Sequence, residues 1–402
     1  MRISSFSDKD EVKKVMCDIG VDPYGIKIML PKTTTFLIHL NAISNITANI
    51  LKQEMLSLGG DVAVARGALT GKIKKGDCLI IGQLNQLYSL TRKLRLQPFG
   101  LDKLANELEE NLNKYTDSNL ILPLKRRILN FNAKTYIMGV INLTPDSFSG
   151  DGLYSTKTRD YPELALLKAK QMLKDGADII DLGGESSRPG AKSISRKEEL
   201  QRVLPVLRKL AKNISAPISI DTRKAEVAKA SLDSGAQIVN DISGLRDKQM
   251  VKIAAKYKAA VVIMHMLGNP LNMQKMITYK SLIGDITSWL KNAVDTAEYA
   301  GVNPDKIIVD PGLGFGKKPG QNLEIIKKLA ELKILGKPIM VGPCRKSFIG
   351  KVLNLDLCER SIGTATACVM AVERGANIVR VHDVQQVNQA LKMATAIRSA
   401  NA

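Results

Sequence analysis

Short apolar runs rich in valine and isoleucine recur eight times between residues 135 and 382, and a helix-period segment follows each of them. This alternation is typical of βα units around a parallel sheet. Eight such units match a (β/α)8 TIM barrel, which usually takes about 250 residues. A doubly wound open sheet is the alternative, but it rarely contains eight unbroken repeats, so the sequence favours the barrel. The expected strands are 135–142, 177–183, 217–221, 237–241, 259–265, 306–310, 338–342 and 377–382.

The residues ahead of this pattern are expected to form a small α/β domain over 1–125, with the barrel domain over 126–402. Strand-like and helix-period runs alternate in this front segment as well. The expected elements are a helix after Ser7, strands at 36–40 and 78–82, helices at 43–58, 83–95 and 101–115, a linker at 115–119 and a β-hairpin at 125–136.

Charge and composition limit the partners of this chain. Its 59 lysine and arginine residues exceed its 39 aspartate and glutamate residues, giving a net charge of +20. Such a surplus suits nucleic acid, membrane surfaces or anionic small molecules. The surplus is spread along the chain and only 4% of the residues are aromatic, which argues against nucleic-acid binding.

The sequence shows neither a membrane-targeting signal nor a cysteine pattern typical of secreted or zinc-binding proteins. No stretch reaches the roughly 18 to 20 apolar residues of a membrane span, and the N-terminus lacks the apolar segment of a signal peptide. The five cysteines are widely spaced without a C-x-x-C pair, so neither a disulfide framework nor a zinc site is indicated. We therefore expect a cytoplasmic protein without a membrane partner.

Polar side chains occupy the end of nearly every expected strand, where the active sites of (β/α)8 barrels lie. Asp221, Asn240 and Asp310 offer hydrogen-bond acceptors that suit a flat heterocycle rich in N–H donors, and nearby apolar residues could line its faces. Strand-end aspartates can instead cap the following helix, and for Asp241 this alternative stays open. The apolar lining residues are Ile242, Met264 and Phe315.

A second group at the same rim consists of Asn142, Arg380 and His382. Arginine presents a fork of N–H groups that pairs with two oxygens at once, so this group suits a phosphate or pyrophosphate. The alternative is a salt bridge between Arg380 and a carboxylate of a neighbouring strand.

Seven ordered motifs together resemble the dihydropteroate synthase family. They are MGVINLTPDSFSGDG (138–152), DIIDLGGESSRPG (178–190), SIDTRKAEVAKASLDSGAQIVNDISG (219–244), MHMLGNP (264–270), DPGLGFGK (310–317), RKSFIG (345–350) and VRVHDV (379–384). The resemblance implies a barrel enzyme of folate biosynthesis, and hence a target of sulfonamides. Such an enzyme condenses 6-hydroxymethyl-7,8-dihydropterin pyrophosphate with 4-aminobenzoate to 7,8-dihydropteroate and pyrophosphate.

The resemblance also implies a role for each motif residue. Asn142, Arg380 and His382 would hold the pyrophosphate, and Asn142 would also meet a Mg2+ ion. Two loops, 143–152 and 184–191, would close over the reactants. The pterin ring would be held by Asp221, Asn240, Asp310 and Lys346, and the aminobenzoate pocket would comprise Phe148, Ser187, Arg188, Pro189, Lys346 and Ser347. The residues expected to take part in catalysis are Asp221, Asp310, Lys346, Arg380 and His382.

Two departures from the family pattern concern these loops. The sequence has SSRPG where the family usually has STRPG, so Ser187 lacks a methyl group beside the expected aminobenzoate pocket; it also has SFSGDG in place of SFSDGG. These changes bear on sulfonamide sensitivity and loop closure more than on the reaction. The competing functions are a methyltetrahydrofolate:corrinoid methyltransferase and a catalytically idle pterin-binding protein. A homodimer is expected from the family resemblance.

Overall fold

The computed structural model describes residues 9–116, 119–125, 127–144, 160–186, 191–270, 272–273 and 277–400. The chain divides into two compact units, of which the first comprises 1–113 with 398–402 and the second 114–397. Among the residues so described, none of the helices combines the length and apolar composition needed to cross a membrane.

The larger unit contains a barrel of eight parallel strands. In the order β11-β10-β9-β8-β7-β6-β13-β12, each strand pairs with its neighbour, and a parallel bridge between Val309 and Ile339 joins the two ends. The prediction of an eight-stranded barrel is therefore confirmed. The strands are β6 (Tyr136–Asn142), β7 (Ile179–Gly183), β8 (Ile218–Asp221), β9 (Ile238–Asp241), β10 (Ala260–Met264), β11 (Ile307–Asp310), β12 (Met340–Val341) and β13 (Ile378–Val381).

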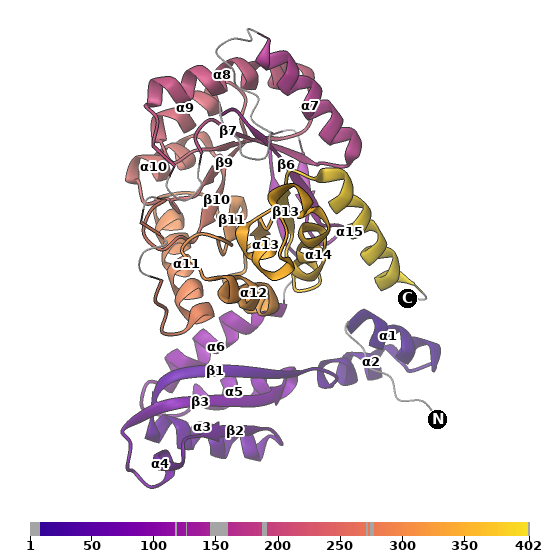
Figure 1. The fold of residues 1–402 in the computed structure, drawn as a ribbon. Coiled ribbons are helices and arrows are strands. Elements are labelled where there is room, and N and C mark those ends of the chain that lie inside the picture. Colours follow the sequence, from indigo (N-terminus) through magenta and orange to yellow (C-terminus); the bar gives the residue numbers. More distant parts are fainter. Residues whose placement is uncertain are drawn as a thin grey trace. The chain divides into compact units, whose positions relative to one another are not determined.

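Helices surround the barrel on its outside (Figure 1). The local sequence sets their ends: Ser195 caps α8 by accepting a hydrogen bond from the Glu198 N–H at 3.2 Å, and Gly176 ends α7 with a φ of 110°, which favours glycine. The helices are α7 (Tyr161–Asp175), α8 (Arg196–Asn213), α9 (Ala225–Asp233), α10 (Lys248–Tyr257), α11 (Leu282–Tyr299), α12 (Pro319–Lys327), α13 (Ser347–Leu353), α14 (Ser361–Val372) and α15 (Val384–Ser399), with the 3-10 turns η2 (Pro304–Lys306), η3 (Leu329–Leu335) and η4 (Leu357–Glu359).

Successive residues of each barrel strand enter different cores, as the alternation of side chains along a strand requires. Met138 belongs to the cluster inside the barrel, whereas Ile137 belongs to the cluster between strands and helices. A hairpin formed by β4 (Ile121–Pro123) and β5 (Ile128–Asn130) adds Leu122 and Leu129 to the inner cluster. The strand residues of this cluster lie at the amino-terminal side of the barrel, so the hairpin closes that end and leaves the carboxyl ends of the strands for a site.

The hairpin begins a few residues before the predicted range of 125–136. Lys125 lies between the two strands, because the apolar side chains on either side of it are the ones that can be buried. Both Leu122 and Leu129 have no exposed surface.

Replacing Leu129 with alanine should destabilise the barrel unit by about 2 to 5 kcal/mol, since it leaves a cavity in a closed core. Urea unfolding followed by the fluorescence of Trp289, the single tryptophan of the chain and a residue of α11, would measure this. Ile128 lies next to Leu129 but is 63% exposed, so Ile128→Ala is the matched control and should change the free energy of unfolding little. Equal effects of the two substitutions would contradict a buried hairpin.

The smaller unit is an antiparallel three-stranded sheet with helices. The order is β1-β3-β2, and α3, α5 and α6 supply apolar residues such as Leu51, Leu90 and Leu108 to one core with Ile80 of β3. An α/β unit was predicted here; the short strand β2 was not. The elements are α1 (Lys9–Asp18), α2 (Pro23–Met29), η1 (Leu30–Lys32), β1 (Thr35–Ser44), α3 (Asn45–Ser57), β2 (Asp61–Val64), α4 (Arg66–Leu69), β3 (Lys75–Gln83), α5 (Leu84–Leu94) and α6 (Leu101–Thr116).

Candidate active site

Three acceptor-bearing side chains predicted to share a site are buried at the carboxyl ends of barrel strands. Asp221 ends β8, Asn240 lies in β9 and Asp310 ends β11. They are 9%, 2% and 5% exposed. Burial of two carboxyl groups at one rim costs free energy unless cations or hydrogen-bond donors compensate it. Two cations of the rim, Arg380 and Lys346, can provide this compensation.

Arg380 of β13 provides one such cation by bridging two carboxylates. Its Nε donates to Asp181 Oδ2 at 2.7 Å, and Nη2 donates to Asp221 Oδ2 at 2.7 Å. The salt-bridge alternative raised for Arg380 is thus present in this structure. Asp181 of β7 has no exposed surface, and its Oδ2 also accepts a hydrogen bond from Asn240 Nδ2 at 3.4 Å. Asp181 was not predicted to belong to the site.

The electrostatics of this group are set by burial and by Arg380. Burial raises the pKa of Asp221 to about 7, Arg380 opposes the rise, and Asp181 adds to it. Burial also raises the pKa of Asp310, against the effect of Lys346. For Arg380 itself, burial would lower the pKa, but Asp181 and Asp221 outweigh it and raise the pKa.

Lys346 provides the second cation, from the residue that precedes α13. Its Nζ donates to the Leu313 carbonyl and lies 4.5 Å from the centre of the Phe315 ring, which is within cation–π range. Burial lowers the pKa of Lys346 to about 8, while Asp310 raises it. Phe315 packs against an apolar cluster at this rim, composed of Ile242, Met264, Met266 and Met273.

Lys317 is a buried cation that was not predicted to support the site. It is 3% exposed, and its Nζ donates to the Phe315 carbonyl at 2.9 Å and lies 3.0 Å from His265 Nδ1. Burial lowers the pKa of Lys317 to about 7 and that of His265 to about 2. The His265 ring packs edge-on against Trp289, with centroids 5.3 Å apart, so His265 serves the packing of α11. The signal for Lys317 was its place in the glycine-rich motif after β11.

Asn142 and His382 meet where two adjacent strands end. Asn142 is the last residue of β6, and His382 directly follows β13. Asn142 Nδ2 lies 3.1 Å from His382 Nε2. Asp241, in contrast, accepts hydrogen bonds from the N–H groups of Ser243 at 2.8 Å and Leu245 at 3.0 Å. Asp241 therefore stabilises the turn after β9, whereas the cap of the following helix α10, the alternative raised for Asp241, is Asp247.

Five predicted contacts of the aminobenzoate pocket remain. Phe148, Ser187, Arg188 and Pro189 fall outside the described residues. Ser347 is exposed and begins α13, next to Lys346.

Glu185 links the two sides of the loop that follows β7. It accepts hydrogen bonds from Ser193 Oγ at 2.8 Å and from the Ile194 N–H at 2.9 Å, and Arg223 Nε binds it at 3.1 Å. Burial would raise the pKa of Glu185, but these partners and Lys224 lower it to about 2. Glu185 thus holds the base of the loop that carries the predicted aminobenzoate contacts.

Replacing Glu185 with glutamine should destabilise the barrel by about 2 kcal/mol at pH 7. The lowered pKa corresponds to about 3 kcal/mol at about 1.4 kcal/mol per pKa unit, and solvent screening of this half-buried group reduces that value. The folded-state pKa of this group is depressed, so its stabilisation is present above about pH 4.3, the unfolded value, and is lost as pH falls towards about 2. Urea unfolding between pH 3 and 7 would show a weaker acid dependence in Glu185→Gln. The exposed ion pair of Glu226 with Arg196 supplies the control, Glu226→Gln, which should behave like the unsubstituted protein.

A metal site must be judged from the donors present. Among the residues that the structure describes, no group of three or more His, Cys, Asp or Glu side chains could hold an ion. The rim nevertheless offers two oxygens around a small space: a Cβ atom at Gly183 would lie 3.6 Å from Asn142 Oδ1 and 3.9 Å from Asp221 Oδ2. Mg2+ commonly takes one or two protein oxygens and completes its shell with water and substrate phosphates. Asn142 at this rim fits such an ion.

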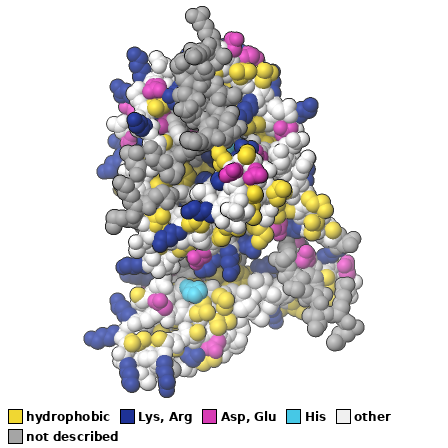
Figure 2. All heavy atoms as spheres, in the orientation of Figure 1, with side chains coloured by type: hydrophobic (Ala, Val, Ile, Leu, Met, Phe, Trp, Pro, Cys, Tyr) yellow, Lys and Arg dark blue, Asp and Glu magenta, His cyan; other side chains and the backbone are white. Residues whose placement is uncertain are grey.

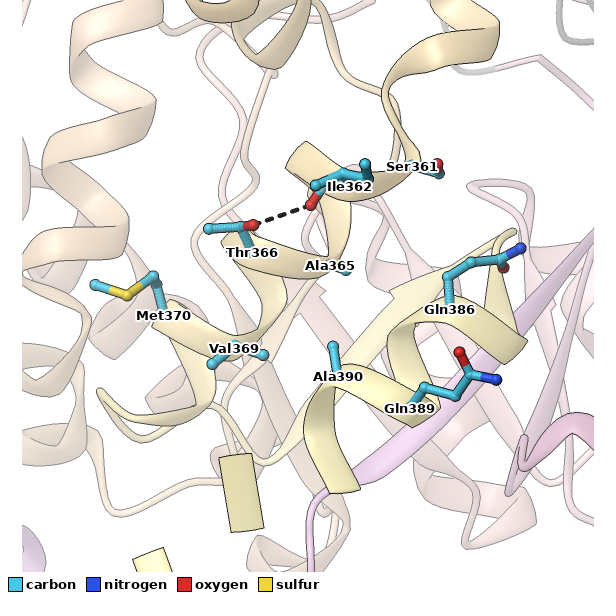
Figure 3. A pocket seen from close by; sticks show the side chains of 9 residues that line it. All are labelled: Ser361, Ile362, Ala365, Thr366, Val369, Met370, Gln386, Gln389 and Ala390. Atoms are coloured by element: carbon cyan, nitrogen blue, oxygen red, sulfur yellow. Dashed lines mark hydrogen bonds between the residues drawn. The ribbon is translucent and has the colours of Figure 1, made fainter. Parts of the chain in front are cut away.

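The surface carries a second feature, a groove of about 400 Å3 between α14 and α15 (Figure 3). It is lined mainly by apolar side chains, including Ile362 and Met370, together with Gln386 and Gln389. These helices form part of the outer layer, and the groove shares none of its residues with the polar rim. Lysine and arginine side chains are found on both units over the face shown in Figure 2, in line with their spread along the sequence.

The barrel matches the family model described as "Pterin binding enzyme" over residues 138–382. This match, which covers more than half of the chain, shows that the protein belongs to the pterin-binding enzymes. A dihydropteroate synthase of Synechocystis sp. is 45% identical over 278 residues, which are 69% of this chain and 94% of that protein. Within the pterin-binding enzymes, the chain is therefore a member of the dihydropteroate synthase family.

Two further comparisons extend this result. The crystal structure of Yersinia pestis dihydropteroate synthase with a sulfonamide drug complex has a TM-score of 0.67 and 39% identity, and the match covers 70% of this chain and all of that one. A probable bifunctional folylpolyglutamate synthase/dihydropteroate synthase of Halobacterium salinarum is 39% identical over 353 residues, which are 88% of this chain and 42% of that protein. Because 353 residues exceed the whole of unit 114–397, this match includes part of the N-terminal unit.

Proposed function

We propose that the chain catalyses the condensation of 6-hydroxymethyl-7,8-dihydropterin pyrophosphate with 4-aminobenzoate, giving 7,8-dihydropteroate and pyrophosphate. The observation that carries this proposal is the cluster at the barrel rim, where Arg380 bridges Asp181 and Asp221 beside the strand end of Asp310. Acceptors for a heterocycle and a cation for an anionic leaving group are thus placed on one rim.

The pterin ring binds to the buried acceptors, because its ring N–H and amino groups can donate to them. Asp221, Asn240 and Asp310 receive these hydrogen bonds, and Lys346 contacts the acceptor side of the ring. Phe315 and its apolar cluster cover a face of the ring. Carboxylates in a buried site interact strongly with positive charge, so Asp221 and Asp310 stabilise the cationic ring that forms when the C–O bond breaks.

The leaving pyrophosphate is stabilised by Arg380, His382 and Asn142. Arginine has five N–H donors, and Arg380 uses Nε and Nη2 for its carboxylates, so further N–H groups of the fork can donate to phosphate oxygens. The amine of 4-aminobenzoate attacks the exocyclic carbon that the pyrophosphate leaves. No side chain has to act as a nucleophile.

The aminobenzoate pocket is assigned to Lys346 and Ser347, together with four residues of the loops. These four are Phe148, Ser187, Arg188 and Pro189. Asn142, through its amide oxygen, would hold Mg2+, which supplies positive charge against the phosphate oxygens of the substrate.

One assay separates this function from its rivals. The full chain is mixed with dihydropterin pyrophosphate, 4-aminobenzoate and Mg2+, and dihydropteroate and released pyrophosphate are both measured. Equal amounts of the two products are expected. Binding of the pterin without product would favour a methyltetrahydrofolate:corrinoid methyltransferase or an idle pterin-binding protein.

We further propose that the protein forms a homodimer through the groove between α14 and α15. Ile362 is 80% exposed and Met370 is 41% exposed, and exposed apolar side chains that line one groove are typical of a contact between chains. Light scattering should give twice the mass of one chain. Ile362→Asp should shift the protein towards the monomer, whereas a monomeric unsubstituted protein would contradict the proposal.

For the N-terminal unit we propose a role in assembly or regulation, because the barrel rim carries the proposed reaction without it. Deletion of residues 1–113 should keep dihydropteroate formation, and comparison of mass and kinetics with the full chain would show which role applies. The deletion must end before the hairpin, since Leu122 belongs to the core inside the barrel.

A further inference from the structure

Cys344 lies against His382 in the loop between β12 and α13. The backbone N–H of His382 donates to Cys344 Sγ at 3.2 Å, and Nδ1 of the His382 ring lies 3.4 Å from the same sulfur. On the other side of the ring, Nε2 lies 3.1 Å from Asn142 Nδ2. The imidazole is therefore held between a thiol and an amide.

The directions of these contacts follow from the chemistry of each group. The amide nitrogen of Asn142 can only donate, so His382 Nε2 accepts, and the hydrogen of a neutral imidazole is then on Nδ1. Nδ1–H points to Cys344 Sγ, and the thiol donates to Asp383 Oδ2 at 3.8 Å. Asp383 is fixed in turn by Arg345, whose Nε binds Oδ2 at 2.9 Å.

Burial raises the pKa of the Cys344 thiol to about 11. The sulfur therefore keeps its hydrogen at neutral pH and can donate to Asp383 while it accepts from His382. Asn142 thus donates to His382, His382 donates to Cys344, and Cys344 donates to Asp383. Each of these hydrogen bonds has one donor and one acceptor.

We propose that Cys344 is a positioning residue that sets the tautomer of His382 and, through it, the orientation of the Asn142 amide. With Nδ2 turned to His382, the amide oxygen Oδ1 faces the space in front of Gly183, where Asp221 Oδ2 also lies. If Nε2 carried the hydrogen instead, Asn142 would have to turn its oxygen to His382 and its NH2 group to the rim. This inference rests on the proposed roles of Asn142 and His382 at the pyrophosphate.

Two substitutions test the sulfur by kinetics. Cys344→Ala removes the acceptor and should lower kcat/KM for dihydropterin pyrophosphate about tenfold and weaken the dependence on Mg2+, while KM for 4-aminobenzoate stays within about twofold. Cys344→Ser keeps an acceptor and a donor and should restore kcat/KM to within about threefold of the unsubstituted enzyme. Cys368→Ala is the control, because Cys368 is a buried free cysteine of the same unit but belongs to α14; it should leave both constants unchanged.

The tautomer can be observed directly, because the chain has only three histidines. In protein labelled with 15N-histidine, the ring signals of His382 are assigned by their loss in His382→Gln. The unsubstituted protein should show Nδ1–H at His382, and Cys344→Ala should shift the tautomer towards Nε2–H. These spectra need no turnover, so failure of the proposed function, seen as no dihydropteroate from the unsubstituted chain, is distinguishable from failure of this inference. An Nε2–H tautomer in the unsubstituted protein, or an unchanged spectrum and unchanged kinetics in Cys344→Ala, would overturn it.

Discussion

Arg380→Met should lower kcat/KM for dihydropterin pyrophosphate by about 1000-fold, equivalent to about 4 kcal/mol of transition-state stabilisation. The substitution removes the cation proposed to stabilise the leaving pyrophosphate. It also leaves Asp181 and Asp221 buried without their partner, which should destabilise the barrel by about 3 to 5 kcal/mol. Steady-state kinetics and urea unfolding would measure the two effects separately.

Loss of stability and loss of catalysis can be separated with a second substitution. In Arg380→Met combined with Asp181→Asn, one of the two uncompensated carboxylates is gone, so part of the stability should return while kcat/KM stays low. Arg380→Lys keeps the charge but cannot bind two carboxylates through a planar fork, so it should fall between the unsubstituted enzyme and Arg380→Met. Recovery of activity together with stability in the double variant would show that Arg380 has a structural role only.

The residues of the rim could be predicted from sequence because the position of a residue in its apolar run fixes which end of the strand it occupies. Asp221 and Asp310 follow buried runs, and the carboxyl ends of parallel strands share one side of a barrel. The partner of each group could not be predicted in this way. Arg380 and Asp181 are 199 residues apart in the chain, and only the closing of the barrel brings β13 close enough to β7 for them to meet.

Short and polar segments escaped prediction for a different reason. The strand β2 is only four residues long and has one fully buried side chain, Val62, so its sequence carries almost no periodic signal. Lys317 looked like part of a glycine-rich turn. Lys317 can be buried because the backbone carbonyl groups of Phe315 and His265 accept hydrogen bonds from it. Every residue has a backbone carbonyl group, so the sequence does not show which of them will accept.

Asp221→Asn should lower kcat/KM for dihydropterin pyrophosphate by about 100-fold, because an amide can offer one oxygen but no negative charge to the cationic ring. The geometry with Arg380 is largely kept, since the amide oxygen can still accept from Nη2. KM for 4-aminobenzoate should change little, because the contact proposed for Asp221 is with the pterin. Asn240, the neutral neighbour on β9, supplies a comparison: Asn240→Ala should impair pterin binding without the same loss in kcat.

The pH dependence gives the more specific test of Asp221. Its folded-state pKa is raised to about 7, so the carboxyl group binds a proton in the folded chain between about pH 4, its unfolded value, and pH 7. Folded protein then holds more protons than unfolded protein, and the free energy of unfolding should fall as pH rises through this range. Over the same range kcat/KM should rise, because only the carboxylate stabilises the cationic ring. Asp221→Asn should lose both dependences, while any titration of the substrate phosphates remains in both proteins. Parallel pH profiles of the two proteins would exclude Asp221 as the group that titrates.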